Sequence, residues 1–406
     1  MQKKTRYEIA QIIQRFLPEV ETQGGLSAHQ RSILKLMSLC KTSALGGHKE
    51  RCDQCHYTRI HYNSCGNRNC PSCQAVNKEK WIYDRQYDLL PVKYYHCVFT
   101  IPSQLYIYFS YNKKLLYDLL FRSVRQTLLA FGQDPKHGVA GKIGAICIPH
   151  TWTQQMTYHP HVHSIVLAGG LNKDGKWKHT KSKGDFLFPV WAMSRLFRGK
   201  LMAELHLMFK NGKLIMTPVM VNQYRQVKDR LYQKGWVVYA KKAFGGPDQV
   251  LEYLGRDSHK ICISNFRILK ITPSHVTFKY LDRKANKQQT KTIKGTDFIR
   301  LFAQHILPKG FVRIRHIGLL ASRVKKTDLH KARKCLGAPS PPPKVKMTTR
   351  EFILLTTGKD PYLCPCCGQG EMVIIHILPP IRGSPIKIPI IRFIAKDRKV
   401  TLQGGL

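Results

Sequence analysis

The spacing of apolar positions changes along the chain, and the first 45 residues show the spacing of helices. Apolar side chains recur there every three or four positions, and Gly24-Gly25 separates two such stripes. Ile9 and Phe16 belong to the first stripe, and the second begins after Ser27, a residue type that caps helix N-termini. The pattern therefore predicts two packing helices.

From residue 94 onward the pattern predicts short strands between longer helices. The predicted strands cover residues 94–101, 143–152, 161–167, 236–240, 263–271 and 275–281. The predicted helices after residue 94 cover residues 105–131, 189–209 and 249–259, and a charged amphipathic helix over residues 78–90 precedes them. Strands interleaved with helices in this way indicate an α+β fold.

Charge narrows the partner of this fold to a polyanion. The 406 residues include 67 Lys and Arg against 24 Asp and Glu, a net charge of +43. Such a surplus opposes compaction unless a polyanion neutralises it, and nucleic acid is the leading candidate. The 43% of hydrophobic residues is typical of a globular chain, which excludes a disordered basic tail. Residues 306–350 hold twelve Lys and Arg against one acid, Asp328, and we interpret them as a phosphate-contacting surface rather than a merely solvated face.

Hydropathy gives no support for a membrane or secreted protein. No segment approaches the roughly 18 apolar residues of a membrane span, and prolines and charges interrupt the most apolar late segment, residues 372–394. The first residues lack the apolar run of a secretory signal. We expect a cytoplasmic, nucleoid-associated protein without a membrane partner.

Cysteines are concentrated in two places, which points to metal sites in a reducing compartment. The first cluster contains Cys52-x2-Cys55 and Cys70-x2-Cys73, the spacing of a four-thiolate structural zinc site. The ligand set stays open, because a nearby side chain can replace one of these four thiols. The candidates for such a replacement are Cys65, His48, His56 and His61.

The second cluster, Cys364-x2-Cys367, is half of a zinc knuckle. No further pair of thiols follows it, and the nearest additional ligands in the sequence are His376 and Cys335. Whether this cluster completes a metal site is left open by the sequence.

The sharpest candidate for catalysis is the segment Tyr158-His-Pro-His161-Val-His163 and the apolar run after it. Alternate residues of a strand point to the same face, so the imidazoles of His161 and His163 can share a divalent cation. His150 and His159 raise the local density of imidazoles. A pair of core histidines is the alternative, and the basic charge and a downstream tyrosine favour the metal.

That tyrosine is Tyr253, which lies in a predicted helix. A phenol with a pKa near about 10 is a poor nucleophile at neutral pH, but it can attack a phosphodiester that a metal polarises. Asp257 lies one turn later, where it could complete the metal coordination, and Arg256 and Lys260 could hold phosphates. A tyrosine packed in a core is the plain alternative.

Taken together, these motifs resemble the HUH-type tyrosine transposases of rolling-circle insertion sequences that carry an N-terminal zinc-binding domain. The resemblance covers most of the chain. It rests on His159-Pro-His161-Val-His163 with Gly169-Gly170, on Glu252-Tyr253-Leu-Gly-Arg256, and on residues 47–55, 63–74, 151–152, 263–265, 307–316 and 364–368.

The resemblance implies a fold and a chemistry. The implied fold is an HUH endonuclease core, an antiparallel sheet flanked by helices, with the two metal-binding histidines on a central strand. The implied reaction is cleavage and rejoining of single-stranded DNA at element ends and target. Tyr253 would form a 5′-phosphotyrosine, with Mg2+ or Mn2+ on His161 and His163. Arg313 and Arg315 lie in a matching segment and are expected to contact DNA.

One departure from the family pattern matters. Many members have a second tyrosine four residues after the first, and this chain has Asp257 there. We favour a single-tyrosine mechanism with Asp257 as third metal ligand, while dependence on a second protomer in a homo-oligomer and an inactivated copy stay open. The alternatives from other classes are a replication initiator or relaxase, and a zinc-dependent nucleic-acid-binding protein without catalysis.

These features predict four parts of the chain. A helical and zinc-binding domain spans residues 1–91, and a catalytic domain with a basic extension spans residues 92–336. A stiff proline-rich linker over residues 337–346 leads to a small Cys-containing tail, residues 347–406.

Overall fold

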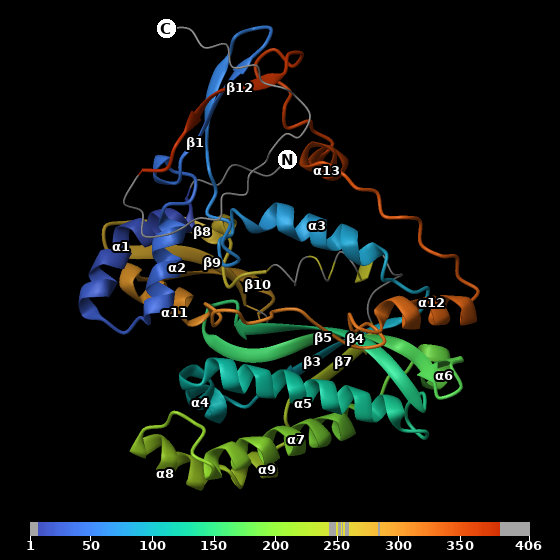
Figure 1. Cartoon of the computed structure of the whole chain (residues 1–406). Helices are drawn as coiled ribbons and strands as arrows, with labels where there is room; N and C mark the ends of the chain where they lie inside the picture. The colour runs from blue at the N-terminus through green and yellow to red at the C-terminus, as the bar shows by residue number, and fades with distance from the viewer. Residues whose placement is uncertain are drawn as a thin grey trace.

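The computed structural model describes residues 7–242, 249–250, 253, 255, 260–282 and 285–381. The described residues form three antiparallel sheets with helices around them, which confirms the α+β class. Figure 1 shows the sheets one above another, with the largest lowest and the smallest sheet at the top.

The largest sheet has the strand order β11-β4-β5-β3-β7, with β6 paired to β5. Its strands are β3 (Tyr94–Thr100), β4 (Gly141–Trp152), β5 (Tyr158–Asn172), β6 (Trp177–His179), β7 (Val238–Lys242) and β11 (Arg315–Gly318). The strand that carries His161 and His163, β5, lies between β4 and β3. The histidine segment is therefore at the centre of the sheet.

Alternation along β5 divides the sheet into two faces with different cover. Val162 and Val166 are fully buried in a core that α5 (Lys113–Gln133) and α7 (Val190–Lys210) complete. The rings of Phe99 on β3 and Phe197 on α7 meet at 5.2 Å between centroids. Short helices extend this layer: α4 (Tyr106–Tyr111), α8 (Pro218–Val227), α9 (Arg230–Gln233) and, beside β6, α6 (Lys181–Gly184).

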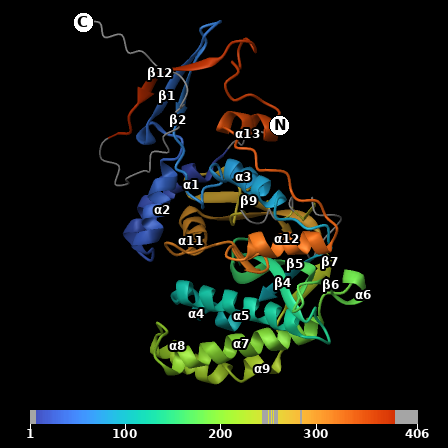
Figure 2. The same cartoon turned by 45° about the vertical axis from the view of Figure 1, so that its right-hand side comes forward.

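The opposite face of this sheet is covered by α3 (Gln74–Gln86) and α12 (Lys325–Cys335), as Figures 1 and 2 show. Ile165 and Leu167 of β5 pack there with Leu329 of α12 in a smaller core. The histidines project from this second face, because they alternate with Val162.

A second body joins segments that are far apart in the sequence. It contains α1 (Ile9–Gln23), α2 (Ala28–Ser38), α11 (Gly295–Gln304) and the sheet of β8 (Ile268–Ile271), β9 (His275–Asp282) and β10 (Lys287–Lys294). These elements share one core, in which the rings of Phe278 and Phe298 meet at 6.0 Å. The first helices thus pack against residues 262–306. The boundary predicted near residue 91 stays a prediction, and this packing crosses it.

The small sheet at the top of Figure 1 has three strands in the order β12-β1-β2. It pairs a segment near the N-terminus with a segment near the C-terminus. β1 (Gly47–Cys52) forms a hairpin with β2 (Thr58–Tyr62), and β12 (Met372–Leu378) pairs with the other edge of β1. α13 (Thr349–Thr357) leads to β12 along the path that Figure 2 shows. The Cys-rich tail is thus built onto the N-terminal hairpin.

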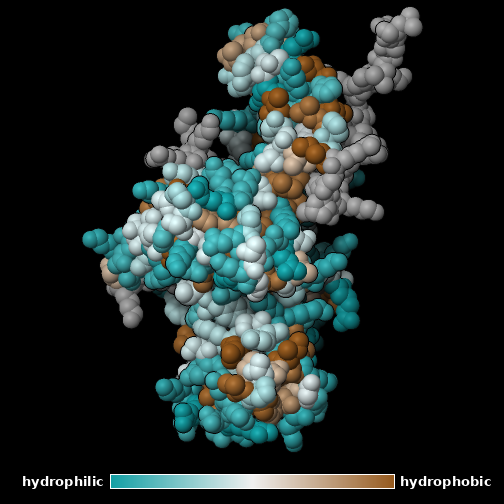
Figure 3. Space-filling model, turned by 90° about the vertical axis from the view of Figure 1, so that its left-hand side faces the viewer, coloured by the Kyte–Doolittle hydropathy of each residue, from teal (hydrophilic) through white to brown (hydrophobic). Residues whose placement is uncertain are grey.

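The small sheet leaves several apolar side chains exposed. Figure 3 shows apolar side chains gathered at the top of the molecule, over the small sheet, where Ile374 and Ile377 are 52% and 74% exposed. Among the described residues the buried apolar cluster of this region consists of Cys52, Cys364 and Met372, and the carboxylate of Glu50 is buried beside them. No helix in the described part of the chain is long and apolar enough to cross a membrane.

Three predicted elements differ from the structure. The expected helix over residues 105–131 is divided into α4 and α5, because the amide of Asn112 bonds both to the carbonyl of Tyr108 and to the backbone of Ile215. α3 begins at Gln74 rather than at residue 78, directly after a thiol cluster. Only the last part of 263–271 is a strand, and most of the predicted helix over 249–259 lies outside the described residues.

Burial of His305 leads to a prediction about stability and pH. Its Nδ1 accepts from the Thr151 hydroxyl at 3.0 Å and its Nε2 donates to the Met156 carbonyl at 2.9 Å. Burial lowers the pKa of His305 to about 4. An unfolded imidazole titrates near about 6.5, so below that pH the unfolded chain binds a proton that the folded chain does not. This ring should therefore lower the free energy of unfolding by up to about 3 kcal/mol as the pH falls from about 6.5 to about 4.

Urea unfolding of His305→Gln and wild type across this pH interval measures the effect. The variant should lose less stability than wild type on acidification. His206→Gln, which replaces an exposed side chain on α7, is the matched control. Equal losses in wild type and His305→Gln would contradict the assignment.

Candidate metal centre and active site

Three histidines meet on the α3 side of the largest sheet. The strand register sets His150 on β4 directly opposite His161 on β5, and His163 follows on the same face of β5. One ring nitrogen of each histidine lies within 4.8 Å of those of the other two. Strand alternation thus brings His161 and His163 together, and β4 adds His150.

The hydrogen bonds of these rings aim nitrogen lone pairs at one point. Nδ1 of His161 donates to the carbonyl of His159 at 2.6 Å, which leaves Nε2 as the unprotonated nitrogen. That Nε2 lies 3.0 Å from Nε2 of His163. Two adjacent ligands of an octahedral cation at about 2.1 Å are separated by about 3.0 Å, so this spacing fits a shared metal ion.

His96 on β3 links this group to Tyr253. Nε2 of His96 lies 2.8 Å from Nδ1 of His163 and 2.9 Å from the hydroxyl oxygen of Tyr253. The hydroxyl of Tyr253 is also 3.4 Å from Nδ1 of His163. An unprotonated Nε2 of His96 has one lone pair, which can accept from the N–H of His163 or from the hydroxyl of Tyr253. The first of these hydrogen bonds would orient His163 as metal-binding imidazoles require. The phenol, His96 and the histidine group are therefore in direct contact.

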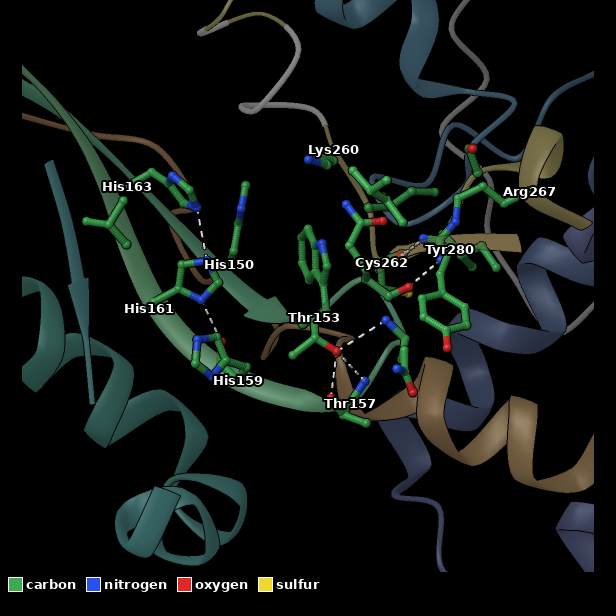
Figure 4. A pocket seen from close by; sticks show the side chains of 18 of the residues that line it. His150, Thr153, Thr157, His159, His161, His163, Lys260, Cys262, Arg267 and Tyr280 are labelled. Carbon is green, nitrogen blue, oxygen red and sulfur yellow. Dashed lines mark hydrogen bonds between the residues drawn. The ribbon is translucent and has the colours of Figure 1, made fainter. Parts of the chain in front are cut away.

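A cavity of about 1650 Å³ opens over these side chains. Its floor is the histidine face of the large sheet, and its walls include Gln74 and Lys78 of α3 and Tyr280 of β9. Figure 4 shows His159, His161 and His163 along one strand, with Lys260 on the far side of the opening and Arg267 and Tyr280 at one end. The cavity thus lies between the largest sheet and the second body.

The lining of this cavity combines aromatic rings with basic side chains. The ring of Trp152 stacks on His150 at 4.8 Å, and Tyr239 and Tyr280 also face the cavity. Lys78 and Lys260 supply positive charge. Stacking rings beside cations are what single-stranded nucleic acid needs from a binding groove.

Arg267, in the same wall of the cavity, binds backbone carbonyls of three segments. Its guanidinium donates to the carbonyls of Lys279, Cys262 and Gln154, which fastens β9 to the loop between β4 and β5. Burial lowers the pKa of this guanidinium. Its side chain therefore maintains the shape of the cavity.

The other residues predicted to contact DNA or the metal lie in different places. Arg315 binds Asp118 and covers the ring of Phe121 at 4.2 Å, so it lies on the α5 side of the sheet, away from the histidines. The guanidinium of Arg313 donates to the carbonyl of Lys260 at the edge of the site. Arg256 and Asp257 lie outside the described residues, and their roles stay predictions.

The cysteines form two separate groups of four, which corrects the predicted grouping. The inner thiol cluster consists of Cys40, Cys65, Cys70 and Cys73, and the outer thiol cluster consists of Cys52, Cys55, Cys364 and Cys367. Within each cluster all sulfur atoms lie within 4.8 Å of one another. The thiols of Cys52 and Cys55 therefore do not share a site with those of Cys70 and Cys73. Cys65, named as a replacement, is a member of the inner cluster.

The inner thiol cluster lies between α2 and α3. Cys40 follows α2, and Cys73 directly precedes the first residue of α3. The Sγ of Cys73 is 3.6 Å from those of Cys40 and Cys65. Four thiolates at about 2.3 Å from a zinc ion would be separated by about 3.8 Å, so the cluster fits zinc. Its position fixes the start of α3, and with it Gln74 and Lys78 in the cavity wall.

Three members of these sites are not identified by sequence motifs. His150 adds to the local density of histidines in the sequence, and the short β4–β5 connection is the signal for its pairing with His161. Cys40 lies twelve residues before the first recognised knuckle, and His96 lies in a run with no metal-binding motif. No spacing rule joins them to the others, because sheet pairing and core packing bring them together.

Comparisons with known proteins agree on one kind of protein. Residues 144–328 match the family described as "Putative transposase", and residues 12–101 match "Transposase zinc-binding domain". The chain is 38% identical over 389 residues to "Putative transposase y4qJ" of Sinorhizobium fredii, covering 93% of this chain and 97% of the relative. It is 29% identical to "Transposase for insertion sequence element IS801" of Pseudomonas savastanoi, covering 85% of this chain and 83% of that protein. No solved structure matches the chain.

The histidine geometry predicts a measurable cation site. His161→Ala and His163→Ala should each weaken Mn2+ binding at least about 10-fold, because each removes a ligand nitrogen. The electron paramagnetic resonance signal of free Mn2+ in titrations of the zinc-loaded protein reports this affinity. His179→Ala, an exposed histidine on β6 of the same sheet, is the matched control. Unchanged affinity in both His161 and His163 variants would contradict the site.

Proposed function

The chain belongs to the family of insertion-sequence transposases with a zinc-binding domain, and we propose that it cuts and rejoins single-stranded DNA through a covalent 5′-phosphotyrosine on Tyr253. The proposal includes rolling-circle transposition, with single-stranded element ends and target as substrates. It places the reaction in the cytoplasm, where the DNA is.

The observation that carries this proposal is the contact between Tyr253 and the histidines. Its hydroxyl is 2.9 Å from Nε2 of His96 and 3.4 Å from Nδ1 of His163, at the floor of the cavity. A tyrosine that served only core packing would have no need of two imidazoles at its hydroxyl. The arrangement supports the proposal, because a phenol beside an imidazole and a group of possible cation ligands can serve as a nucleophile.

His161 and His163 would hold the catalytic cation, with His150 beside them and Asp257 as the predicted oxygen ligand. An imidazole-rich set fits Mn2+ better than Mg2+, which prefers oxygen ligands. When bound, the cation polarises the scissile phosphate and stabilises the charge that develops on it. Lys260 is positioned to hold a neighbouring phosphate of the strand.

The chain's own residues supply the nucleophile and the group that accepts its proton. The hydroxyl oxygen of Tyr253 attacks the phosphorus, and its proton passes to Nε2 of His96. The bond from phosphorus to the 3′ oxygen breaks, and that oxygen leaves as a 3′-OH after taking a proton from water. The phosphotyrosyl bond conserves the energy of the cleaved bond, so attack by another 3′-OH reseals a strand and returns the phenol.

The path of the strand follows from the lining of the cavity. Bases can stack on Trp152, Tyr239 and Tyr280 while Lys78 and Lys260 face the backbone. The net charge of +43 predicts binding that weakens steeply with salt, because bound cations are released from the DNA. A second copy of the chain supplying another nucleophile is the alternative to a single-tyrosine cycle.

The inner thiol cluster belongs to the zinc-binding domain, and we propose that its four thiolates bind the structural Zn2+ of that domain. Cys40, Cys65 and Cys70 are buried in the core that α1, α2 and α11 share. Zinc there would fix the position of α3, whose Gln74 and Lys78 line the cavity.

A covalent adduct is the direct test of the nucleophile. With Mn2+ and single-stranded oligonucleotides that carry the element ends, wild type should form a protein–DNA adduct that resists denaturing electrophoresis. Tyr253→Phe should abolish it, because the attacking oxygen is lost, and His161→Ala should reduce it at least about 100-fold. Tyr239→Phe, which removes a hydroxyl from the same cavity, is the matched control and should retain the adduct. An adduct that persists in Tyr253→Phe would reassign the nucleophile.

His96 can be tested separately from metal binding. His96→Asn should lower the single-turnover rate of cleavage about 100-fold or more at neutral pH, while Mn2+ affinity changes less than in His163→Ala. The rate of the variant should rise with pH across the range where wild type is flat, since hydroxide then removes the phenolic proton. Equal rates in His96→Asn and wild type would exclude His96 as proton acceptor.

A further inference from the structure

The outer thiol cluster draws its members from opposite parts of the chain. Cys52 ends β1 and Cys55 lies in the turn before β2, whereas Cys364 and Cys367 lie between α13 and β12. The Sγ atoms of Cys55 and Cys364 are 3.6 Å apart, although 309 residues separate them in the sequence. Cys52 and Cys367 meet at 3.7 Å.

The geometry of these sulfur atoms fits a metal. The separations are close to the roughly 3.8 Å edge of a zinc tetrathiolate tetrahedron. All thirteen cysteines of the chain are free thiols. Cys52 and Cys364 are almost fully buried, Cys367 is partly buried and Cys55 is exposed. Buried thiolates need a cation beside them to offset the cost of burying their charge.

Both knuckles also show the backbone arrangement that supports bound thiolates. The N–H groups of Gln54 and Cys55 each donate to Sγ of Cys52 at 3.4 Å. In the second knuckle the N–H of Cys366 donates to Sγ of Cys364 at 3.4 Å and that of Gly370 to Sγ of Cys367 at 3.3 Å. These donors stabilise sulfur that carries negative charge, which is the state that binds zinc.

The small sheet around the cluster has little else to hold it together. Its strands leave Ile374 and Ile377 exposed, and among the described residues its buried apolar cluster holds only two thiols and Met372, beside the buried carboxylate of Glu50. Three short strands without an apolar core are only marginally stable in water, so small modules of this kind use a metal as a staple.

We propose that the outer thiol cluster binds a second structural Zn2+, which fastens the C-terminal segment of the chain onto the N-terminal hairpin. The site lies partly outside the zinc-binding domain at residues 12–101, since Cys364 and Cys367 come from beyond it. It does not depend on the proposed DNA chemistry, because no catalytic side chain takes part.

The proposed outer zinc site would also help to position α3. Lys344, near the end of the linker, pairs with Asp84 at 2.9 Å, and Phe352 of α13 meets the ring of Tyr83 at 6.1 Å between centroids. Asp84 and Tyr83 lie on α3, whose first turns line the active-site cavity. The clamped segment thus holds α3 on the side away from the inner thiol cluster, as Figure 1 shows for α13 above α3.

Zinc stoichiometry of the purified full chain tests the proposal. Wild type should contain two zinc ions per chain by elemental analysis, and the Cys364→Ser/Cys367→Ser variant should contain one. Cys52→Ser/Cys55→Ser should also contain one. The variant with all four substitutions should still contain one, because both pairs serve the same ion. Cys366→Ser, an exposed thiol in the same loop but outside the cluster, is the matched control and should retain two.

Two zinc ions in Cys364→Ser/Cys367→Ser, or a single ion in wild type, would overturn the proposal. Cys52 and Cys55 would then not share a zinc ion with Cys364 and Cys367. The remaining ion in each variant reports that the inner cluster, and the core around it, is still folded.

Gly370→Ala provides a test that leaves every thiol in place. A Cβ at this position would overlap Sγ of Cys52, whereas a Cβ at Gly199 in α7 meets nothing within 4 Å. Gly370→Ala should release one of the two zinc ions to a chelator at least about 10-fold faster than wild type, and Gly199→Ala should not. Identical release from the three proteins would contradict the site.

Discussion

The alternation of side chains along β5 is the constraint on which the rest of the molecule depends. Val162 must face the core over α5 and α7, so His161 and His163 must face the opposite side. A shift of one residue in the register of β5 would bury both imidazoles among apolar helices. The large core beneath the sheet therefore fixes the direction of the histidines, and the neighbouring strands then bring His150 and His96 to the same face.

Above this face the molecule is held by contacts between distant parts of the chain. The inner thiol cluster lies at the first residue of α3, and the end of the linker and α13 contact the far part of α3 through Lys344 and Phe352. The cavity thus has a floor made by one sheet and a roof made by elements whose positions depend on thiols. Metal binding at cysteines and chemistry at histidines are in this way parts of one architecture, although they are far apart in sequence.

Local sequence patterns predict part of this structure. Period-two alternation predicted that His161 and His163 share a face, and capping by Ser27 marked the start of α2. The grouping of the cysteines could not be predicted, because knuckle spacing identifies pairs and only folding decides which pairs meet. His96 was missed for the same reason: its partners lie on another strand and on a distant helix. The break at Asn112 depends on a contact with Ile215, which no local propensity records.

The central claim is that Tyr253, placed against His96 and His163, becomes joined to DNA. Mass spectrometry of the protease-digested protein–DNA adduct, after nuclease trimming of the strand, tests this most directly. The account predicts that the nucleotide mass is found on the peptide that contains Tyr253, attached through a 5′-phosphate to its phenolic oxygen. Nucleotide attached to any other residue, or to Tyr253 through a 3′-phosphate, would contradict it.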